Sequence, residues 1–295
     1  MTNTSLPPPL AGLSREADQG QREASASHRR GPLALSINKT VEAAHWGPDP
    51  TEAPTLVLLH EGLGSVGLWR NFPAQLVAAT GCGVFAWSRF GYGRSDPAPL
   101  PWPADYMHRE AHGAMPAVLD AAQIGRCLLV GHSDGASIAA IYASRQDPRV
   151  RGLVLLAPHF FVEDATIDAI RRITTSYIAD GLLRARLARH HADPDMAFHG
   201  WSNAWLDRGF RRSFDLSADL ARIRVPMLIL QGRHDPYGTE AQPRMAQALA
   251  AGPVETVLLE AGHAPHLDAE SASIDAIAGF AETLLPDQNA DAASQ

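Results

Sequence analysis

The sequence has few cysteines and lacks a long hydrophobic run, and these two absences narrow the class of protein. Only Cys82 and Cys127 occur in its 295 residues, and they can neither build a disulfide framework nor match the spacing of a zinc knuckle. No run approaches the roughly 18 apolar residues that a membrane-spanning helix needs. A formal net charge of −7 argues against a basic nucleic-acid-binding protein. We therefore expect a cytoplasmic protein that binds neither nucleic acid nor membrane.

The two ends of the chain differ in composition from its middle. Residues 1–30 contain a Pro-Pro-Pro run and scattered Ser, Gln, Arg and Glu, with almost no bulky apolar side chains. Such a segment cannot bury enough surface to offset its ordering entropy, and it lacks the apolar region of a secretory signal peptide. We predict flexible tails over 1–30 and 286–295.

Between the tails, short apolar runs bounded by Gly or Pro alternate with helix-length amphipathic segments. Runs of this kind are typical of buried parallel strands, and their alternation with helices indicates an α/β protein with a doubly wound parallel sheet. A hairpin around 33–46 is expected to add antiparallel strands at one edge. The predicted strands cover 55–60, 83–88, 126–131, 152–157, 226–231 and 254–259, and the predicted helices cover 68–80, 104–123, 136–145, 244–250 and 271–285.

One segment interrupts this alternation. Residues 159–220 contain no clear strand, only helix-like runs such as 164–187 and 198–214. Because the segment lies between two core strands, we predict that it forms a helical cap over the carboxyl edge of the sheet. The predicted core then comprises residues 31–158 and 221–285.

The strongest chemical signal is the segment Gly131-His132-Ser133-Asp134-Gly135, which follows a predicted strand and opens a predicted helix. This is the context of a nucleophile elbow, where a sharp turn strains the serine and requires small residues on either side. We predict that Ser133 is a catalytic nucleophile.

A serine hydroxyl needs a base, and the base needs an acid that orients it. Asp235 follows the predicted strand 226–231, and His263 follows the last predicted strand. The chain order Ser, Asp, His places all three at the carboxyl edge of the sheet, so we predict a triad. His266 is an alternative base and Asp164 an alternative acid.

An oxyanion hole needs two backbone N–H groups directed at the developing negative charge. We assign one to Asp134, directly after the nucleophile, and the other to Gly62 in the loop after the first long strand. The segment 62–67 also fits a dinucleotide-binding fingerprint, and Arg89 could hold a phosphorylated ribose. NADP binding would leave the later motifs unexplained, so we expect no cofactor.

Several aromatic and polar residues are candidates for a substrate pocket, although ordinary packing explains the aromatic ones equally well. His108 and His112 have a spacing that can bind zinc, but no third ligand is evident. His190 and His191 could bind a metal together with Asp193 and Asp195, but a polar loop explains them better. We therefore expect no metal. The pocket candidates are Glu61, Trp69, His132, His159, Phe160, Trp201 and Trp205.

With these motifs the chain resembles the α/β-hydrolase superfamily, over roughly residues 33–285. The resemblance rests on the His60-Glu61-Gly62 loop, the segment 88–95, the Ser133 elbow and the loops that carry Asp235 and His263. It implies an eight-stranded sheet, a lid between strands six and seven, and acyl chemistry without a cofactor. Members commonly have glycine where this chain has Glu61, and a carboxylate facing an oxyanion would oppose catalysis. We hypothesise that Glu61 turns aside to fix the loop or receives a cationic or hydroxyl group of the substrate.

Together, these motifs predict a serine hydrolase that cleaves a small or aryl acyl ester or thioester through an acyl-enzyme. Alternatives that use the same three residues are a hydrolase of carbon–carbon bonds in vinylogous diketones and a cofactor-free perhydrolase. A ligand-binding module that keeps the fold without turnover is the alternative of another class. The expected partner is a small-molecule acyl substrate, and a homodimer is compatible with the sequence.

Overall fold

The sheet begins at His28, inside the segment predicted to be a tail. β1 (His28–Leu35) pairs with β2 (Lys39–Trp46) along its whole length, with His28 opposite Trp46. The rings of these two residues stack with their centroids 4.9 Å apart, which extends the strand beyond the predicted boundary. The computed structural model describes residues 28–285, so the predictions for 1–27 and 286–295 lie outside the described residues.

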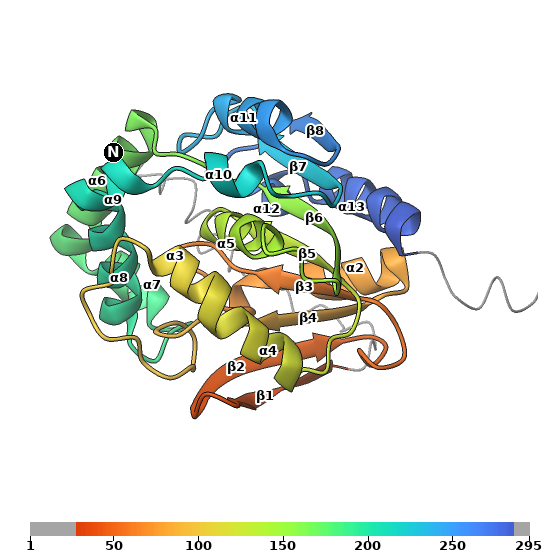
Figure 1. The fold of residues 1–295 in the computed structure, drawn as a ribbon. Helices are drawn as coiled ribbons and strands as arrows, with labels where there is room; N and C mark the ends of the chain where they lie inside the picture. The colour runs from red at the N-terminus through yellow and green to blue at the C-terminus, as the bar shows by residue number, and fades with distance from the viewer. Residues whose placement is uncertain (1–27, 286–295) are drawn as a thin grey trace, which may run out of the picture.

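The sheet has eight strands in the order β1-β2-β4-β3-β5-β6-β7-β8 (Figure 1). β1 and β2 form an antiparallel hairpin at one edge, β2 runs antiparallel to β4, and all other neighbours are parallel. The predicted doubly wound, mostly parallel sheet is thereby confirmed. The parallel strands are β3 (Thr55–Leu59), β4 (Gly83–Trp87), β5 (Cys127–His132), β6 (Val150–Leu156), β7 (Met227–Gly232) and β8 (Val254–Leu259).

Alternate residues of the central strands point to opposite faces of the sheet, and both faces are buried. Val57 of β3 belongs to one apolar cluster and Leu58 to a second, which explains why these strands read as continuous apolar runs. Helices cover both faces (Figure 1). They are α2 (Phe72–Thr80), α3 (Tyr106–Arg109), α4 (Met115–Ala121), α5 (Asp134–Ala143), α11 (Ala241–Leu249), α12 (Pro265–Asp268) and α13 (Glu270–Leu284), with a 3-10 turn η2 (Val66–Trp69) and a π-helical turn η3 (Glu110–Ala114).

Two elements differ from their predictions. β8 is not buried on both faces, and Glu255 is exposed, because β8 is an edge strand that pairs with β7 alone. The helix predicted over 104–123 is divided into α3, the π-helical turn and α4. A π-helical turn is rare and leaves no mark in hydrophobic periodicity, so the pattern could not predict it.

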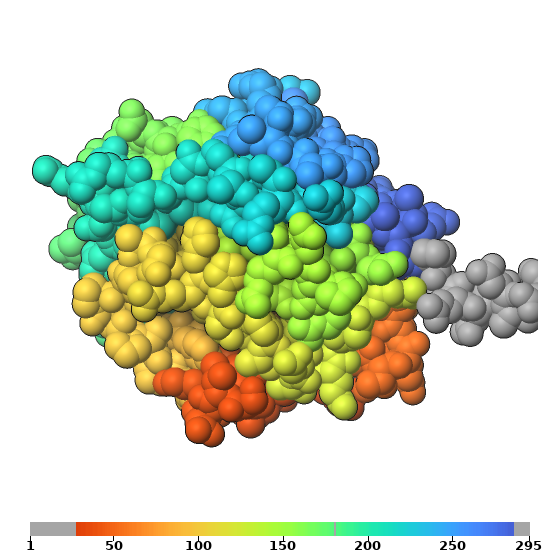
Figure 2. Space-filling model, in the orientation of Figure 1, coloured from red at the N-terminus to blue at the C-terminus, as the bar shows by residue number. Residues whose placement is uncertain are grey.

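Five helices replace the strand–helix alternation between β6 and β7. α6 to α9 lie beyond the carboxyl ends of the parallel strands, on the left of Figure 1, whereas α10 lies beside α5. Figure 2 shows this segment in green to teal, forming one end of the molecule. Within residues 28–285 no helix is long and apolar enough to cross a membrane. The five are α6 (Asp164–Asp180), α7 (Leu182–Leu187), α8 (Pro194–Leu206), α9 (Arg208–Ser213) and α10 (Ser217–Leu220).

Candidate active site

Ser133 lies in a strained turn between β5 and α5. Its backbone angles are φ 52° and ψ −117°, in the region that non-glycine residues rarely adopt. A Cβ atom on Gly131 would overlap the carbonyl oxygen of Gly135, and one on Gly135 would overlap that of Leu59. The two glycines are therefore required by close backbone contacts, as the predicted elbow demands.

The structure brings the three predicted residues together. Nε2 of His263 lies 2.9 Å from Oγ of Ser133, and Nδ1 of His263 lies 2.9 Å from both carboxylate oxygens of Asp235. Ser133 is 6% exposed and His263 is 2% exposed, so bulk water hardly competes for these hydrogen bonds. This is the geometry in which an imidazole can accept a proton from a serine hydroxyl.

Three further donors fix the carboxylate of Asp235. The backbone amides of Tyr237 and Gly238 donate to Oδ1 at 2.8 and 3.3 Å, and Nε2 of Gln231 donates to Oδ2 at 2.9 Å. Burial favours a higher pKa for Asp235, but the charge and hydrogen bond of His263 hold that pKa below its usual value. Asp235 therefore stays ionised and orients the imidazole.

The two alternative residues lie elsewhere. The ring of His266 packs against those of Trp69, Phe72 and His132, with centroids 5.1, 5.4 and 4.8 Å away. Asp164 is exposed at the start of α6, where its carboxylate lies 3.3 Å from Arg211. Neither residue contacts Ser133 or His263, so neither can take the role of base or acid in this arrangement.

The loop after β3 is held by hydrogen bonds to its carbonyl groups. The carbonyl oxygen of Glu61 accepts from Nδ1 of His60 at 2.7 Å and from Nη2 of Arg89 at 3.0 Å, and that of Gly62 accepts from the Tyr92 hydroxyl at 2.7 Å. His60 donates through Nδ1 because its Nε2 accepts from the Arg89 amide at 3.0 Å. The loop geometry therefore depends on Arg89 and Tyr92, which follow β4.

Gly62 and Asp134, the two predicted oxyanion donors, line the same cavity as Ser133. Among the described residues, neither backbone amide has a hydrogen-bond acceptor, so both are available to a ligand. The carboxylate of Asp134 is fully buried and accepts from Tyr106 at 2.6 Å and Trp205 at 3.1 Å. Burial raises its pKa, although the Arg89 guanidinium, 3.9 Å away, opposes the shift.

The cavity above Ser133 has a volume of about 20 Å³, which is space for about one water molecule. Four of the predicted pocket residues line it: Glu61, His159, Trp201 and Trp205. Burial, aided by the nearby His263, lowers the pKa of His159 to about 3, so its imidazole is neutral at pH 7. Within this small space, α6 and α8 supply the wall opposite the sheet.

Three of the predicted pocket residues do not line the cavity. Trp69 is 2% exposed because η2 turns it into the apolar cluster beneath the sheet. Phe160 is fully buried in the other cluster, and its amide donates to Gln242 at 2.7 Å. His132 points away from the cavity and donates through Nε2 to the carbonyl oxygen of His263 at 2.7 Å. The structure thus places these three side chains away from the cavity, a direction that the sequence pattern does not reveal.

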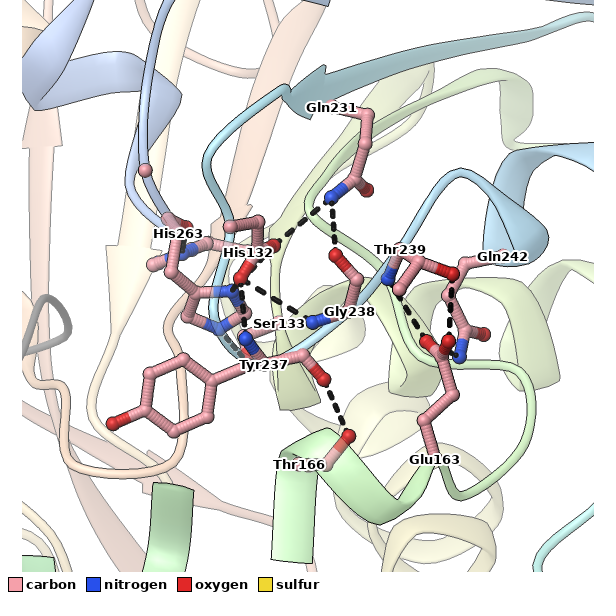
Figure 3. A network of polar contacts seen from close by, with 12 residues as sticks. His132, Ser133, Glu163, Thr166, Gln231, Tyr237, Gly238, Thr239, Gln242 and His263 are labelled. Carbon is pink, nitrogen blue, oxygen red and sulfur yellow. Dashed lines mark hydrogen bonds and ion pairs between the residues drawn. The ribbon is translucent and has the colours of Figure 1, made fainter. Parts of the chain in front are cut away.

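Four lining residues were not predicted: Leu63, Thr166, Ile170 and Tyr237. Thr166 and Ile170 are one turn apart on α6, a spacing that could have indicated a shared face. Figure 3 shows that the Thr166 hydroxyl donates to the carbonyl oxygen of Tyr237.

A second group of contacts anchors the start of α6 to the loop that carries Asp235. The carboxylate of Glu163 accepts from Thr239, both backbone and hydroxyl, and from Gln242 (Figure 3). The inserted helices are thus joined to the site through both α6 and the segment after β7.

The other sites considered from the sequence are the glycine-rich segment 62–67 and the histidine pairs. In the segment 62–67, Gly62 lies directly under Trp201, and Nη2 of Arg89 is held by the Glu61 carbonyl oxygen and lies beside Asp134. His191 accepts from the Gly93 amide at 2.9 Å and donates to the Leu63 carbonyl at 3.0 Å. Among residues 28–285, no three His, Cys, Asp or Glu side chains are grouped to hold a metal ion.

The fold and the strained serine at the carboxyl edge are those of an α/β hydrolase. Residues 56–276 match the alpha/beta hydrolase family, which is well over half of the chain. The chain therefore belongs to this family.

Relatives carry several hydrolase names. The chain is 32% identical over 240 residues, 73% of this chain and 89% of the relative, to a protein of Pseudomonas savastanoi pv. phaseolicola that carries the name carbamate hydrolase RutD. It is 26% identical over 221 residues, 65% of this chain and 74% of the relative, to a 2-hydroxy-6-oxononadienedioate/2-hydroxy-6-oxononatrienedioate hydrolase of Paraburkholderia xenovorans. The enol-lactonase of Burkholderia xenovorans shares the fold, with a TM-score of 0.64, 21% identity and coverage of 85% and 99%. Family and relatives together support a hydrolase activity.

Proposed function

We propose that this protein is a serine hydrolase that cleaves a small or aryl acyl ester or thioester through an acyl-enzyme. The observation that carries the proposal is the continuous hydrogen-bonded chain from Ser133 through His263 to Asp235, with 2.9 Å at each step. The open amides of Gly62 and Asp134 lie beside it in the same cavity.

The proposed reaction has two halves. Oγ of Ser133 attacks the acyl carbon while Nε2 of His263 takes its proton, and the carbonyl oxygen becomes an oxyanion that accepts from the Gly62 and Asp134 amides. The tetrahedral intermediate collapses, and His263 gives its proton to the leaving alcohol or thiol. A water molecule, deprotonated by His263, then attacks the acyl-enzyme and releases the acid. Asp235 balances the imidazolium in both halves.

The small cavity limits the substrate and gives the inserted helices a role. A volume of about 20 Å³ cannot hold an acyl group together with its leaving group. We infer that α6 to α9 act as a cap that opens to admit substrate, moving Trp201 and Trp205 away from Ser133. A short acyl chain then needs the smallest displacement, which favours small acyl groups as substrates.

Glu61 adds a further preference. Its carboxylate turns toward Gly64 and His132, so it does not face the oxyanion position, yet Glu61 still lines the cavity. An ionised carboxylate there favours a substrate with a hydroxyl or cationic group near the scissile bond.

The likeness to the dienedioate hydrolase supports a second candidate, the cleavage of a carbon–carbon bond in a vinylogous diketone. It would use the same serine, histidine and aspartate. Parallel assays with p-nitrophenyl acetate, acetyl thioesters and a vinylogous diketone acid distinguish the candidates by their kcat/KM values, and peroxide-driven halide oxidation reports a perhydrolase.

The first experiment is the intact mass after reaction with a fluorophosphonate. The wild-type protein is expected to gain one adduct, and Ser133→Ala to gain none. Ser271→Ala, which changes an exposed serine, is the matched control and should label like the wild type. A folded wild-type protein without an adduct, or an adduct that persists in Ser133→Ala, would contradict the proposal.

A further inference from the structure

A second cavity, larger than the one at Ser133, lies on the other side of the oxyanion loop. It is an open groove of about 590 Å³, within the range of small-molecule sites. Its walls are the β1–β2 turn, the loop 98–103 after β4, and the turns of α3 and η3. On the face in Figure 2, the gold and yellow residues of this region lie between the red hairpin and the teal helices.

The groove is predominantly aromatic and apolar. The rings of Tyr92 and Trp102 lie 5.4 Å apart, and those of Trp102 and Tyr106 lie 5.5 Å apart, forming a continuous aromatic row. Phe90 and three prolines, Pro99, Pro101 and Pro103, complete the wall. Such a surface favours a planar apolar body, because aromatic rings pack on one another in offset or edge-on arrangements.

Two polar side chains line this apolar groove and have unused hydrogen-bonding atoms. Arg89 is 3% exposed, and its Nη1 makes no hydrogen bond to the described residues. Glu110, in the π-helical turn, has a shielded Oε1 that also lacks a partner among them. A buried guanidinium N–H without an acceptor is costly, and a carboxylate group of a ligand would satisfy it with a charge-assisted hydrogen bond.

The wall between the groove and the Ser133 cavity consists of Arg89, Tyr92 and Tyr106. Each of these residues lines the groove, yet its polar end contacts the site: Arg89 donates to Glu61, Tyr92 to Gly62, and Tyr106 to Asp134. The guanidinium of Arg89 also lies over the Tyr92 ring, 4.9 Å from its centroid. A ligand in the groove would therefore press directly on the groups that position both oxyanion donors.

We propose that this groove binds a small aromatic carboxylate, separately from the Ser133 cavity, and that its occupancy changes the reactivity of Ser133. The carboxylate head accepts from Nη1 of Arg89, and the aromatic body lies along Trp102 and Tyr106. The segment 97–103 is mostly exposed, which allows the shift that admits the head group to the shielded atoms.

Glu110 makes this binding depend on pH. Burial raises its pKa to about 7, while the nearby Arg89 opposes the shift. When protonated, Glu110 can donate to the ligand carboxylate, and when ionised it repels it, so affinity falls as pH rises through about 7. Tyr92 and Tyr106 have raised pKa values and stay neutral in this range. The charged and titratable groups that act on Glu110 are Arg89 and Tyr92, and Tyr106 and Arg109 line the same groove.

The test measures binding of 3-phenylpropanoate by calorimetry to Ser133→Ala, so that turnover plays no part, with 3-phenylpropan-1-ol as the neutral comparison. A Cβ on Gly113 meets no atom within 4 Å, and Gly113 lines the groove, so Gly113→Leu is the variant chosen to fill the groove. Gly279→Leu in α13 has the same free space and is the matched control.

We expect one carboxylate per chain, at least tenfold weaker binding of the alcohol, and at least tenfold weaker binding of the carboxylate to Gly113→Leu than to Gly279→Leu. Affinity should fall toward tenfold per pH unit above about pH 7, and Glu110→Gln should remove this dependence. Equal affinities of the two leucine variants, or no binding at millimolar concentration, would overturn the proposal.

The effect on Ser133 has its own readout and rests on the proposed function. In an otherwise wild-type protein, 3-phenylpropanoate should change the fluorophosphonate labelling rate at least threefold, and the change should vanish in Gly113→Leu. An unchanged rate at saturating ligand would overturn the coupling. If Ser133 takes no label at all, the proposed function fails, and calorimetry still decides whether the groove binds.

Discussion

Nδ1 of His132 lies 3.5 Å from Oε2 of Glu61, and the two side chains connect the loop after β3 to the loop that carries His263. Nε2 of His132 donates to the carbonyl oxygen of His263 at 2.7 Å, so this nitrogen carries a proton. Burial favours a higher pKa for Glu61, but the hydrogen bond and charge of His132 hold that pKa well below its usual range. The pair thus holds the Glu61 carboxylate against His132 at the edge of the Ser133 cavity.

Loss of the Glu61 carboxylate should weaken the fold. Glu61→Gln should lower the free energy of unfolding at pH 7 by about 1–3 kcal/mol, because His132 loses its anionic partner. The lowered pKa means that Glu61 stabilises the fold above its ordinary pKa near 4.5 and loses this contribution as pH falls below it. Urea unfolding at pH 7 and pH 3.5 measures both effects.

The control for this prediction is Glu260→Gln, whose carboxylate is 74% exposed and pairs with exposed Arg233 and His234. It should change stability by less than about 0.5 kcal/mol. If the cost of Glu61→Gln is as large at pH 3.5 as at pH 7, the carboxylate is not the stabilising group.

Much of the fold and the centre of the site follows from local sequence. The strands could be predicted because a strand buried on both faces is apolar at every position, and the strained turn at Ser133 could be predicted because it needs Gly131 and Gly135. Asp235 and His263 follow strands, and parallel strands bring their carboxyl ends to one edge. Each of these inferences depends on a few adjacent residues.

The pocket could not be predicted in the same way, because its lining depends on packing between distant segments. Trp69 and Trp201 are both aromatic residues near the site, but one faces the core beneath the sheet and the other covers Gly62. The position of Arg89 after a strand suited a phosphate ligand, but its burial beside Asp134 could not be predicted from that position. Side-chain direction and burial are tertiary properties, and no short motif encodes them.

Asp235→Asn tests the orienting carboxylate. The amide keeps the shape and can still accept from Tyr237 and Gly238, but its NH2 group can face Nδ1 of His263 and stabilise the wrong tautomer. We expect kcat for p-nitrophenyl acetate to fall by about 10⁴-fold. Asp168→Asn, at an exposed carboxylate, should leave kcat unchanged. A loss of less than tenfold in Asp235→Asn would show that Asp235 has no orienting role.

Gly62 is required by the approach of a side chain rather than by its backbone angles. A Cβ there would overlap Nε1 of Trp201, so Gly62→Ala must displace either the oxyanion loop or the indole. We expect kcat/KM to fall at least 100-fold in Gly62→Ala, since a shifted amide misses the oxyanion. Adding Trp201→Leu should recover at least tenfold by making room. No recovery would mean that the loop itself, and not the contact with Trp201, is intolerant of the methyl group.

Glu110 should make the stability of the protein decrease between about pH 4.5 and pH 7. Burial raises its pKa to about 7, so over this interval the folded protein keeps a proton that the unfolded chain has lost. Each pH unit of such a difference corresponds to about 1.4 kcal/mol, and the half-buried position of Glu110 reduces the total to about 1–3 kcal/mol.

Glu110→Gln removes the titration, so its stability relative to the wild type should increase from pH 4.5 to pH 8 in urea unfolding. Glu282→Gln, at an exposed position of α13, should show no such trend. A constant difference between Glu110→Gln and the wild type across this range would place the pKa of Glu110 near its ordinary value and would remove the basis for pH-dependent binding in the groove.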